Sequence, residues 1–100
     1  MEGHASISND VVARYAADAA RDVAGVHALV ESHLPRHRGV RVNGDDGRVR
    51  LELHVEVEWG ASCGVVGREV QRRVREYVER MTDVRLDAVD VVVDEIAAPS

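Results

Sequence analysis

The residues best suited to chemistry are five histidines, one cysteine and several groups of acids and arginines. His27, His33 and His37 are the histidines whose spacing suggests a metal site, because residues four apart align two imidazoles on one face of a helix. Pro35 stands between two of them and disfavours a regular helix, and Glu31 is the one acidic ligand nearby. We therefore predict no metal site and no cofactor.

Cys63 stands at the expected start of a helix, where the helix dipole can lower a thiol pKa and produce a nucleophile or a redox sensor. The alternative is a small apolar residue in the first helical turn. No histidine stands beside it in the sequence, and the chain shows no pairing of nucleophile and base, so we expect no enzymatic activity. A single cysteine excludes a disulfide framework within the chain and indicates a reducing compartment.

Acidic residues alternate with apolar ones along a segment centred on His54. Because Glu52 and Glu56 flank this histidine, its pKa is expected to be raised, so that the segment either responds to pH or is simply a solvated sheet face. Such a surface suits a basic protein partner better than catalysis. The predicted partner-binding residues are Glu52, His54, Glu56, Glu58, Asp90 and Asp94.

The 13 basic residues are all arginine and face 18 acids, giving a net charge of −5. This balance disfavours nonspecific binding to nucleic acid and to anionic lipid. A local cluster of arginines nevertheless supports an alternative, a nucleic-acid contact around an expected hairpin. With 3% aromatic residues the chain lacks a stacking surface, and no glycine-rich phosphate loop is present. The arginines of this alternative are Arg36, Arg38, Arg41, Arg48 and Arg50.

The elements that must position these residues begin near the N-terminus. A short edge strand is expected over His4–Ile7, and Ser8 is the expected cap of a helix over about Asn9–Ala24, whose apolar face is rich in alanine. Gly25 suits the left-handed residue that often ends a helix. The following segment, Val26–Arg38, has no clean period and is interpreted as an irregular connector.

A β-hairpin is expected over Gly39–Val42 and Arg48–Trp59, around a stretch of turn-forming residues. Its second strand alternates apolar and polar residues without a break, which is typical of a strand buried on one face. Ser62 is the expected cap of a second helix that reaches Met81, with charged pairs at spacing four on its outer face. The valine-rich run Arg85–Ile96 predicts a last strand, followed by a disordered tail.

The order is therefore β-α-β-β-α-β. We predict an α+β two-layer sandwich in which two helices pack on one face of a mostly antiparallel sheet. At 100 residues the chain has room for one domain, 1–100, with an ordered core of about 5–96. No apolar run is long enough to span a bilayer and no signal peptide is visible, so a cytoplasmic protein is expected, in contact with a membrane only through a partner.

Several short features recur in a characteristic order between Ile7 and Ile96: an Ile-Ser opening, an alanine-rich helix ending in Gly-Val, a strand ending in aromatic-Gly, a Val-Gln step, a Met-Thr step and a valine-rich last strand. In this set the chain resembles the alkaline-shock, or general-stress, family of envelope stress response proteins of Gram-positive bacteria. The residues concerned are Ile7, Ser8, Val11, Val12, Ala16 to Ala20, Gly25, Val26, Gly39, Val40, Trp59, Gly60, Val70, Gln71, Val74, Val78, Met81, Thr82, Val89, Val91 and Val93.

The resemblance implies a small non-enzymatic domain linked to cell-envelope homeostasis and stress, which works by self-association or by binding a membrane-associated protein. The chain departs from the family pattern at Asp83, where glycine is usual after Met-Thr, at Trp59, where tyrosine is commoner, and at Cys63, where an aliphatic residue is usual. The last departure favours an inert thiol. The alternatives are an RNA- or ribosome-associated module that uses the arginines, and a metal or redox sensor.

Overall fold

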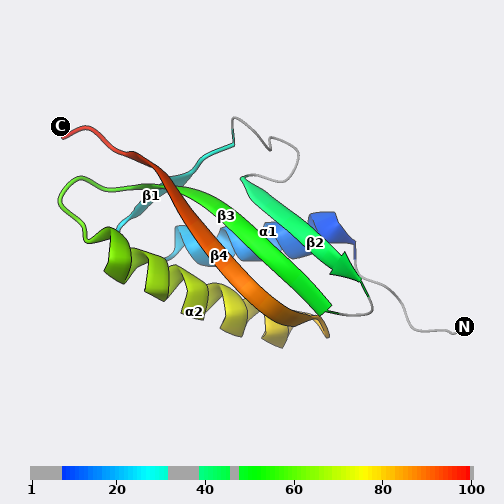
Figure 1. Ribbon diagram of the computed structural model, residues 1–100. Helices are drawn as coiled ribbons and strands as arrows, with labels where there is room; N and C mark the ends of the chain where they lie inside the picture. Colours follow the sequence, from blue (N-terminus) through cyan, green and yellow to red (C-terminus); the bar gives the residue numbers. More distant parts are fainter. Residues whose placement is uncertain (1–7, 32–38, 46–47, 100) are drawn as a thin grey trace, which may run out of the picture.

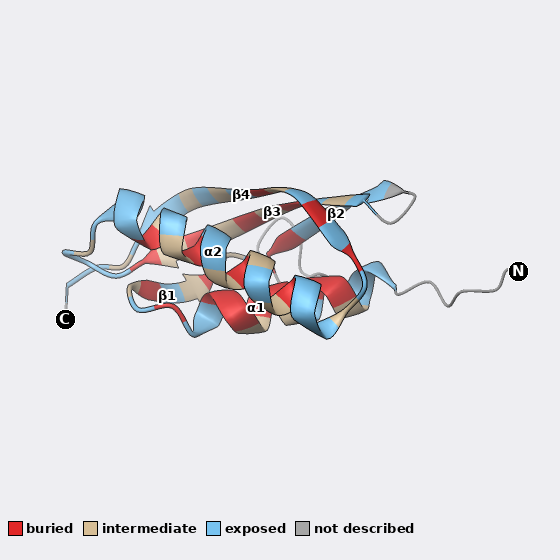
Figure 2. Cartoon of the chain, turned by 90° about the horizontal axis from the view of Figure 1, so that it is seen from below, coloured by how far each residue is buried: buried red, intermediate tan, exposed pale blue. Residues whose placement is uncertain are grey.

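The computed structural model describes residues 8–31, 39–45 and 48–99, which form two helices and a four-stranded sheet. The helices lie together on one face of the sheet (Figure 1), and the view from below shows the strands 40–45, 48–57 and 85–96 on one side of the helices and the short strand 26–29 beside the first helix (Figure 2). The α+β two-layer architecture is therefore as predicted. The elements are α1 (Asn9–Arg21), β1 (Val26–Leu29), β2 (Val40–Asp45), β3 (Arg48–Val57), α2 (Cys63–Met81) and β4 (Arg85–Ile96).

The long strand β3 organises the sheet. One of its edges pairs antiparallel with β2 along its first part and with β1 near its end, and the opposite edge pairs parallel with β4 along its whole length. The sheet is thus mixed and mostly antiparallel. A parallel neighbour requires a crossover, and α2 supplies it between β3 and β4. Within the described residues β4 pairs with β3 alone, so its other edge faces outward.

Helix α1 owes its close packing to alanine. Ser8 caps the helix by accepting a hydrogen bond from the Val11 N–H at 3.2 Å. The helix ends at Arg21, three residues before the expected end at Ala24, because the chain turns there through hydrogen bonds to the last carbonyls of the helix. Small side chains let α1 approach its neighbours closely. The helix presents completely or almost completely buried alanines at positions 13, 16, 17 and 20.

Gly25 allows the tight turn from α1 into β1. Its φ of +96° is left-handed, as expected for a glycine at this point. A Cβ at this position would also lie 2.5 Å from Cγ2 of Val66 in α2. This position therefore requires glycine both for its conformation and for the space around it.

The irregular connector expected over Val26–Arg38 is wrong for its first residues, which form β1. Val26 and Leu29 are buried, and they pair with Val57 and Val55 of β3. A four-residue edge strand carries too few residues for a visible alternation, and it forms because β3 offers an edge to pair with. Residues 32–38 and the strand expected over His4–Ile7 lie outside the described residues. Within the described residues the order is α-β-β-β-α-β.

The hairpin and the second helix follow the sequence closely. Strand β2 extends three residues beyond the expected Val42, and β3 ends two residues before Trp59. Ser62 caps α2 by accepting from the Val65 N–H at 3.3 Å. The row of valines at 66, 70, 74 and 78 is buried against the rest of the core. Neither helix of the described part of the chain is long and apolar enough to cross a membrane.

Thr82 ends α2 without the glycine that is usual after the Met-Thr step. Its backbone N–H donates to the Val78 carbonyl at 3.0 Å, and its hydroxyl donates to the same oxygen at 2.8 Å. The hydroxyl oxygen also accepts from the Val84 N–H at 3.0 Å. Asp83 therefore stands in a turn that Thr82 holds, and β4 begins two residues later, as predicted. Ala97, the expected start of a disordered tail, still donates its N–H to the Val57 carbonyl at 2.8 Å.

Candidate functional site

The polar face of the sheet is set by the alternation along β3. Leu51, Leu53, Val55 and Val57 point to the helices and are buried, so the residues between them point to the opposite face. That face carries Glu52, His54 and Glu56, which are half-buried. The register with β4 adds Asp90 beside Glu52 and Val92 beside His54. The predicted acidic surface therefore exists on strands β3 and β4.

His54 is the centre of this surface because it bridges two carboxylates. Its Nε2 lies 2.6 Å from Oε2 of Glu52 on the same strand, and its Nδ1 lies 2.7 Å from Oδ2 of Asp94 on β4. The side chain of His54 is only 16% exposed. An imidazolium has two N–H donors and can serve both carboxylates at once, whereas a neutral imidazole has one. The geometry therefore fits the charged form.

Two opposing influences act on the pKa of His54. Burial lowers the pKa, and the hydrogen bonds that the ring donates to Glu52 and Asp94, together with the charges of these carboxylates, raise it by more. The net pKa lies above the ordinary value. The raised pKa expected from the sequence is thus found, but the second carboxylate is Asp94 from β4 rather than Glu56 from the same strand.

The other predicted members of the acidic surface are not hydrogen-bonded to this cluster. Glu56 is aligned with Glu95 of β4, Glu58 lies exposed just beyond the end of β3, and Asp90 is exposed beside Glu52. A flat sheet face with fixed charges offers contacts to another protein and no enclosed space for a small substrate.

The sequence predicts partner contact through the polar face of the sheet or through an exposed strand edge, without indicating the strand; the structure shows such an edge on β4. At Leu86 both backbone groups point to this edge, because the N–H donates to Oε2 of Glu79 at 2.8 Å and the carbonyl accepts from Nη1 of Arg75. The carbonyl of Val89 points the same way and accepts from Nε2 of Gln71 at 2.9 Å. Side chains of α2 thus cover the first half of the edge.

The second half of that edge is uncovered. From Val89 the backbone alternates without a register shift as far as Val93, so the N–H and C=O of Val91 and Val93 also point outward. Among the described residues no hydrogen bond reaches these four groups. Unpaired groups on an edge strand are a template for pairing with another chain. We call this segment, Val91–Val93, the open edge.

Exposed apolar side chains lie on β4 and at the end of the molecule where β4 finishes. Val92 on the polar face is 37% exposed and Ile96 at the end of β4 is 55% exposed. Trp59 follows β3, and Val65 lies in the first turn of α2; their exposed fractions are 66% and 57%. Both segments lie at the end of the molecule where β4 finishes (Figure 1). Of these side chains, Val92 lies within the open edge and Ile96 three residues beyond its end, on the same strand.

The arginines of the alternative nucleic-acid surface do not form a free positive patch where they are described. Arg41 is aligned with Glu52 across β2 and β3. Arg48 donates from Nε to Oδ1 of Asp87 at 3.1 Å. Arg50 is exposed. Arg36 and Arg38 lie outside the described residues.

The candidate metal and redox residues are separate in the structure. His27 is exposed on β1, and Cys63 is exposed at the first position of α2. His33 and His37 lie outside the described residues. In the ranges 8–31, 39–45 and 48–99, no group of three or more His, Cys, Asp or Glu residues is placed to hold a metal ion.

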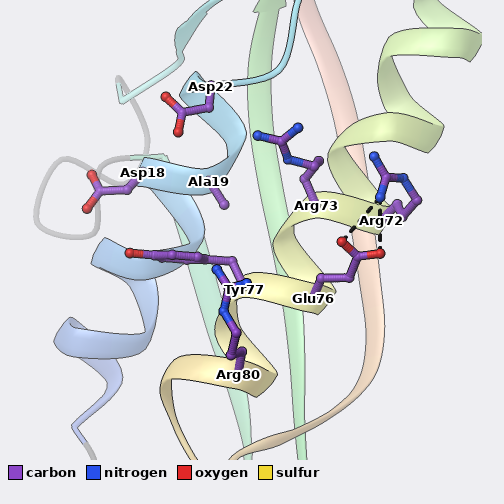
Figure 3. A pocket seen from close by; sticks show the side chains of 8 residues that line it. All are labelled: Asp18, Ala19, Asp22, Arg72, Arg73, Glu76, Tyr77 and Arg80. Atoms are coloured by element: carbon purple, nitrogen blue, oxygen red, sulfur yellow. Dashed lines mark hydrogen bonds and ion pairs between the residues drawn. The ribbon is translucent and has the colours of Figure 1, made fainter.

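A groove of about 410 Å³ runs between α1 and α2 (Figure 3). The ring of Tyr77 packs edge-on against Tyr15 with centroids 5.6 Å apart, and Arg80 lies over the Tyr77 ring. Arg72 bonds to Glu76 at 3.1 Å and to Glu69, and this bond lowers the pKa of Glu69. The lining carries acidic and basic side chains in equal number, so it favours no charged ligand. The lining residues are Asp18, Ala19, Asp22, Arg72, Arg73, Glu76, Tyr77 and Arg80.

Residues 1–98 match the model of the alkaline shock protein 23 family, described as having a cell envelope-related function. The chain is 24% identical over 106 residues to the uncharacterized protein YloU of Bacillus subtilis, a match that covers 94% of this chain and 88% of that protein. The fold is similar to that of the MamM CTD. A single-residue variant of that domain aligns with a TM-score of 0.62 and 15% identity, over 91% of this chain and 100% of the other. A variant in a zinc form gives 0.60 and 16%, over 90% and 87%.

Proposed function

Because the chain belongs to the alkaline shock protein 23 family, whose function is cell envelope-related, we propose that it is a protein-interaction domain in cell-envelope homeostasis and stress response. It works by self-association or by binding a membrane-associated protein at the open edge of β4. Membership of the family supports the role at the cell envelope, and the open edge of β4 supports the binding of another chain.

The observation that carries the proposal is the unpaired backbone of Val91 and Val93. The rest of β4 pairs with β3, and side chains of α2 cover the first half of its outward edge. An extended segment of another protein satisfies such groups by adding one strand to the sheet. The apolar side chains of Val92 and Ile96 stand next to this edge and would be covered by the same contact. If the partner is a membrane-associated protein, the polar face beside the edge, with Glu52 and Asp90, favours one that carries basic residues.

The domain is proposed to be non-enzymatic. In its best-defined titratable cluster both ring nitrogens of His54 are occupied by Glu52 and Asp94, on an open sheet face, and this supports the proposal. In the cell the domain is proposed to stand in the cytoplasm close to the membrane, where its partner would hold it.

The test is a crosslinked pull-down of the tagged protein from its native cells, with half of each sample treated with nuclease. Recovery of an envelope or membrane protein, or of further copies of the chain, in both halves is expected. Binding that disappears with nuclease would reject the proposal in favour of the alternative RNA-associated module, and Arg41, Arg48 and Arg50 would then be the residues to replace.

A matched pair of variants localises the contact in the same experiment. Val93→Pro removes an outward N–H of the open edge and leaves the hydrogen bonds to β3 in place, because edge strands tolerate proline where the N–H faces solvent. Cys63→Pro places proline at the first helical position of α2, which also tolerates it. Loss of the partner in the first variant and its retention in the second is expected. Equal recovery in both would place the contact elsewhere.

A further inference from the structure

The polar residues of α2 that cover β4 belong to one row of the helix, which stops abruptly. Gln71, Arg75 and Glu79 are four residues apart and lie one position beyond the buried valine row. Four residues of a helix span about 6 Å and two residues of a strand span about 6.6 Å. Read toward the helix start, each residue of the row therefore lies beside a point about two residues further along β4 than the one before it. The next member toward the helix start is Gly67, level with about Val91.

Gly67 has no packing reason to be glycine. A Cβ at this position would meet nothing within 4 Å. Glycine inside a helix costs about 1 kcal/mol relative to alanine. The gap in the row therefore leaves the open edge accessible, with room beside it for the backbone of another chain.

Resting on the proposed function, we infer that the occupant of the open edge is β4 of a second copy of this chain, paired antiparallel with Val92 opposite Val92 of the other copy. In this register Val91 of each copy forms a hydrogen-bonded pair with Val93 of the other. All four outward groups of each open edge are then used. A two-fold axis perpendicular to the sheets joins them into one sheet and keeps both helical layers on the same side.

Neighbouring registers fit less well. Centring the pairing on Val91 places Val89 opposite Val93 and requires the Val89 carbonyl, which Gln71 already occupies at 2.9 Å. Centring it on Val93 runs into the register shift that follows this residue, where Glu95 is aligned with Glu56. Directly opposed residues must point to the same face, which excludes centres between two residues.

The side chains are also compatible with pairing around Val92. Val92, exposed in the single chain, would be covered by the same residue of the other copy. Asp90 would lie opposite Asp94 of the other copy, and the charge of Asp94 is already compensated by His54 at 2.7 Å. The α2 helices would run side by side beneath the new strand pair, and Gly67 permits their close approach.

Disulfide trapping tests the register. In a Cys63→Ser background, Val92→Cys places two thiols at a non-hydrogen-bonded pair, where Cα atoms are about 4.5 Å apart and within reach of a disulfide. A covalent dimer is expected under mild oxidation. The control is His27→Cys in the same background, because His27 is exposed on β1, at the other edge of the sheet. Dimerisation of the Val92→Cys variant no faster than that of the control would overturn the inference.

Gly67→Gln tests the open edge without threatening the fold. The glutamine continues the polar row, fills the gap and improves helix propensity. The variant is expected to melt at a higher temperature than the wild type and to dimerise at least ten times more weakly in sedimentation velocity. Dimerisation unchanged from wild type, or a wild-type chain that stays monomeric at high micromolar concentration, would overturn the inference.

The two proposals fail in different ways. If the chain stays monomeric but an envelope protein is still captured, and Val93→Pro abolishes that capture, the second copy is rejected while the interaction function stands. If nothing but nuclease-sensitive material is captured, the proposed function is rejected as well.

Discussion

Replacing His54 with glutamine should destabilise the protein in a pH-dependent way. The imidazolium joins Glu52 of β3 to Asp94 of β4, and Arg41 of β2 is aligned with Glu52 on the same face. Hydrogen bonds to charged groups contribute about 1.5–3 kcal/mol. The bond to Glu52, whose side chain is 36% exposed, is screened and contributes at most about 1 kcal/mol. We expect His54→Gln to cost about 2–3 kcal/mol at pH 6.

The sign of the pH dependence follows from the raised pKa of His54. A proton bound more tightly in the folded state stabilises the fold fully below about pH 6.5, and this stabilisation is lost as the pH rises through the folded pKa. Above that pKa the neutral ring has one N–H and leaves one carboxylate without a donor. The difference between wild type and variant should therefore shrink between pH 6 and pH 9.

The assay is urea denaturation at both pH values, with the midpoint of the variant at pH 6 expected about 1 M lower or more. His27→Gln is the matched control, because this exposed histidine on β1 has no part in the cluster and its replacement should change stability little at either pH. An equal loss of stability for His54→Gln at pH 6 and pH 9 would refute the reasoning and show that the ring acts only by packing.

Three further changes have defined outcomes. Gly25→Ala should cost about 2–4 kcal/mol in thermal melts, since it combines a left-handed φ of +96° with a Cβ 2.5 Å from Cγ2 of Val66; a melting temperature equal to wild type would contradict this geometry. Ala16→Leu should cost about 1–3 kcal/mol in urea, because Ala16 is completely buried where α1 packs closely, and a neutral result would show that the helix can move away. Cys63→Ser should change stability by less than about 0.5 kcal/mol, and the exposed thiol of the wild type should react with a thiol reagent without unfolding; slow reaction would mean that the thiol is covered in solution.

The sequence predicts the elements whose patterns are long and regular. The alternation along residues 48–57 and the valine row of α2 each extend over several repeats, so burial on one face leaves a clear periodic signal. The last strand is found at its expected bounds, Arg85–Ile96. Ser8 and Ser62 are recognisable as caps because their hydroxyls satisfy N–H groups that every helix start leaves unpaired.

The sequence does not predict what depends on tertiary pairing. The strand Val26–Leu29 forms because β3 offers its edge, and nothing within those residues shows this. The pairing of His54 with Asp94 depends on the parallel register of β3 and β4. The open edge depends on where the side chains of α2 reach. Its signal in the sequence is Gly67, a glycine inside a helical pattern, which is recognisable as a gap once the row of Gln71 and Arg75 is known.

One-sided pairing divides the amides of β4 into two alternating classes. The N–H of Val92 faces β3, while those of Val91 and Val93 face outward. In a single chain with nothing paired to this edge, the outward amides should exchange fast in deuterated water, and the Val92 amide only when β4 separates from β3. Whatever pairs with this edge must therefore slow exchange at Val91 and Val93, so these two amides report whether the edge is occupied, and the Val92 amide is the internal reference.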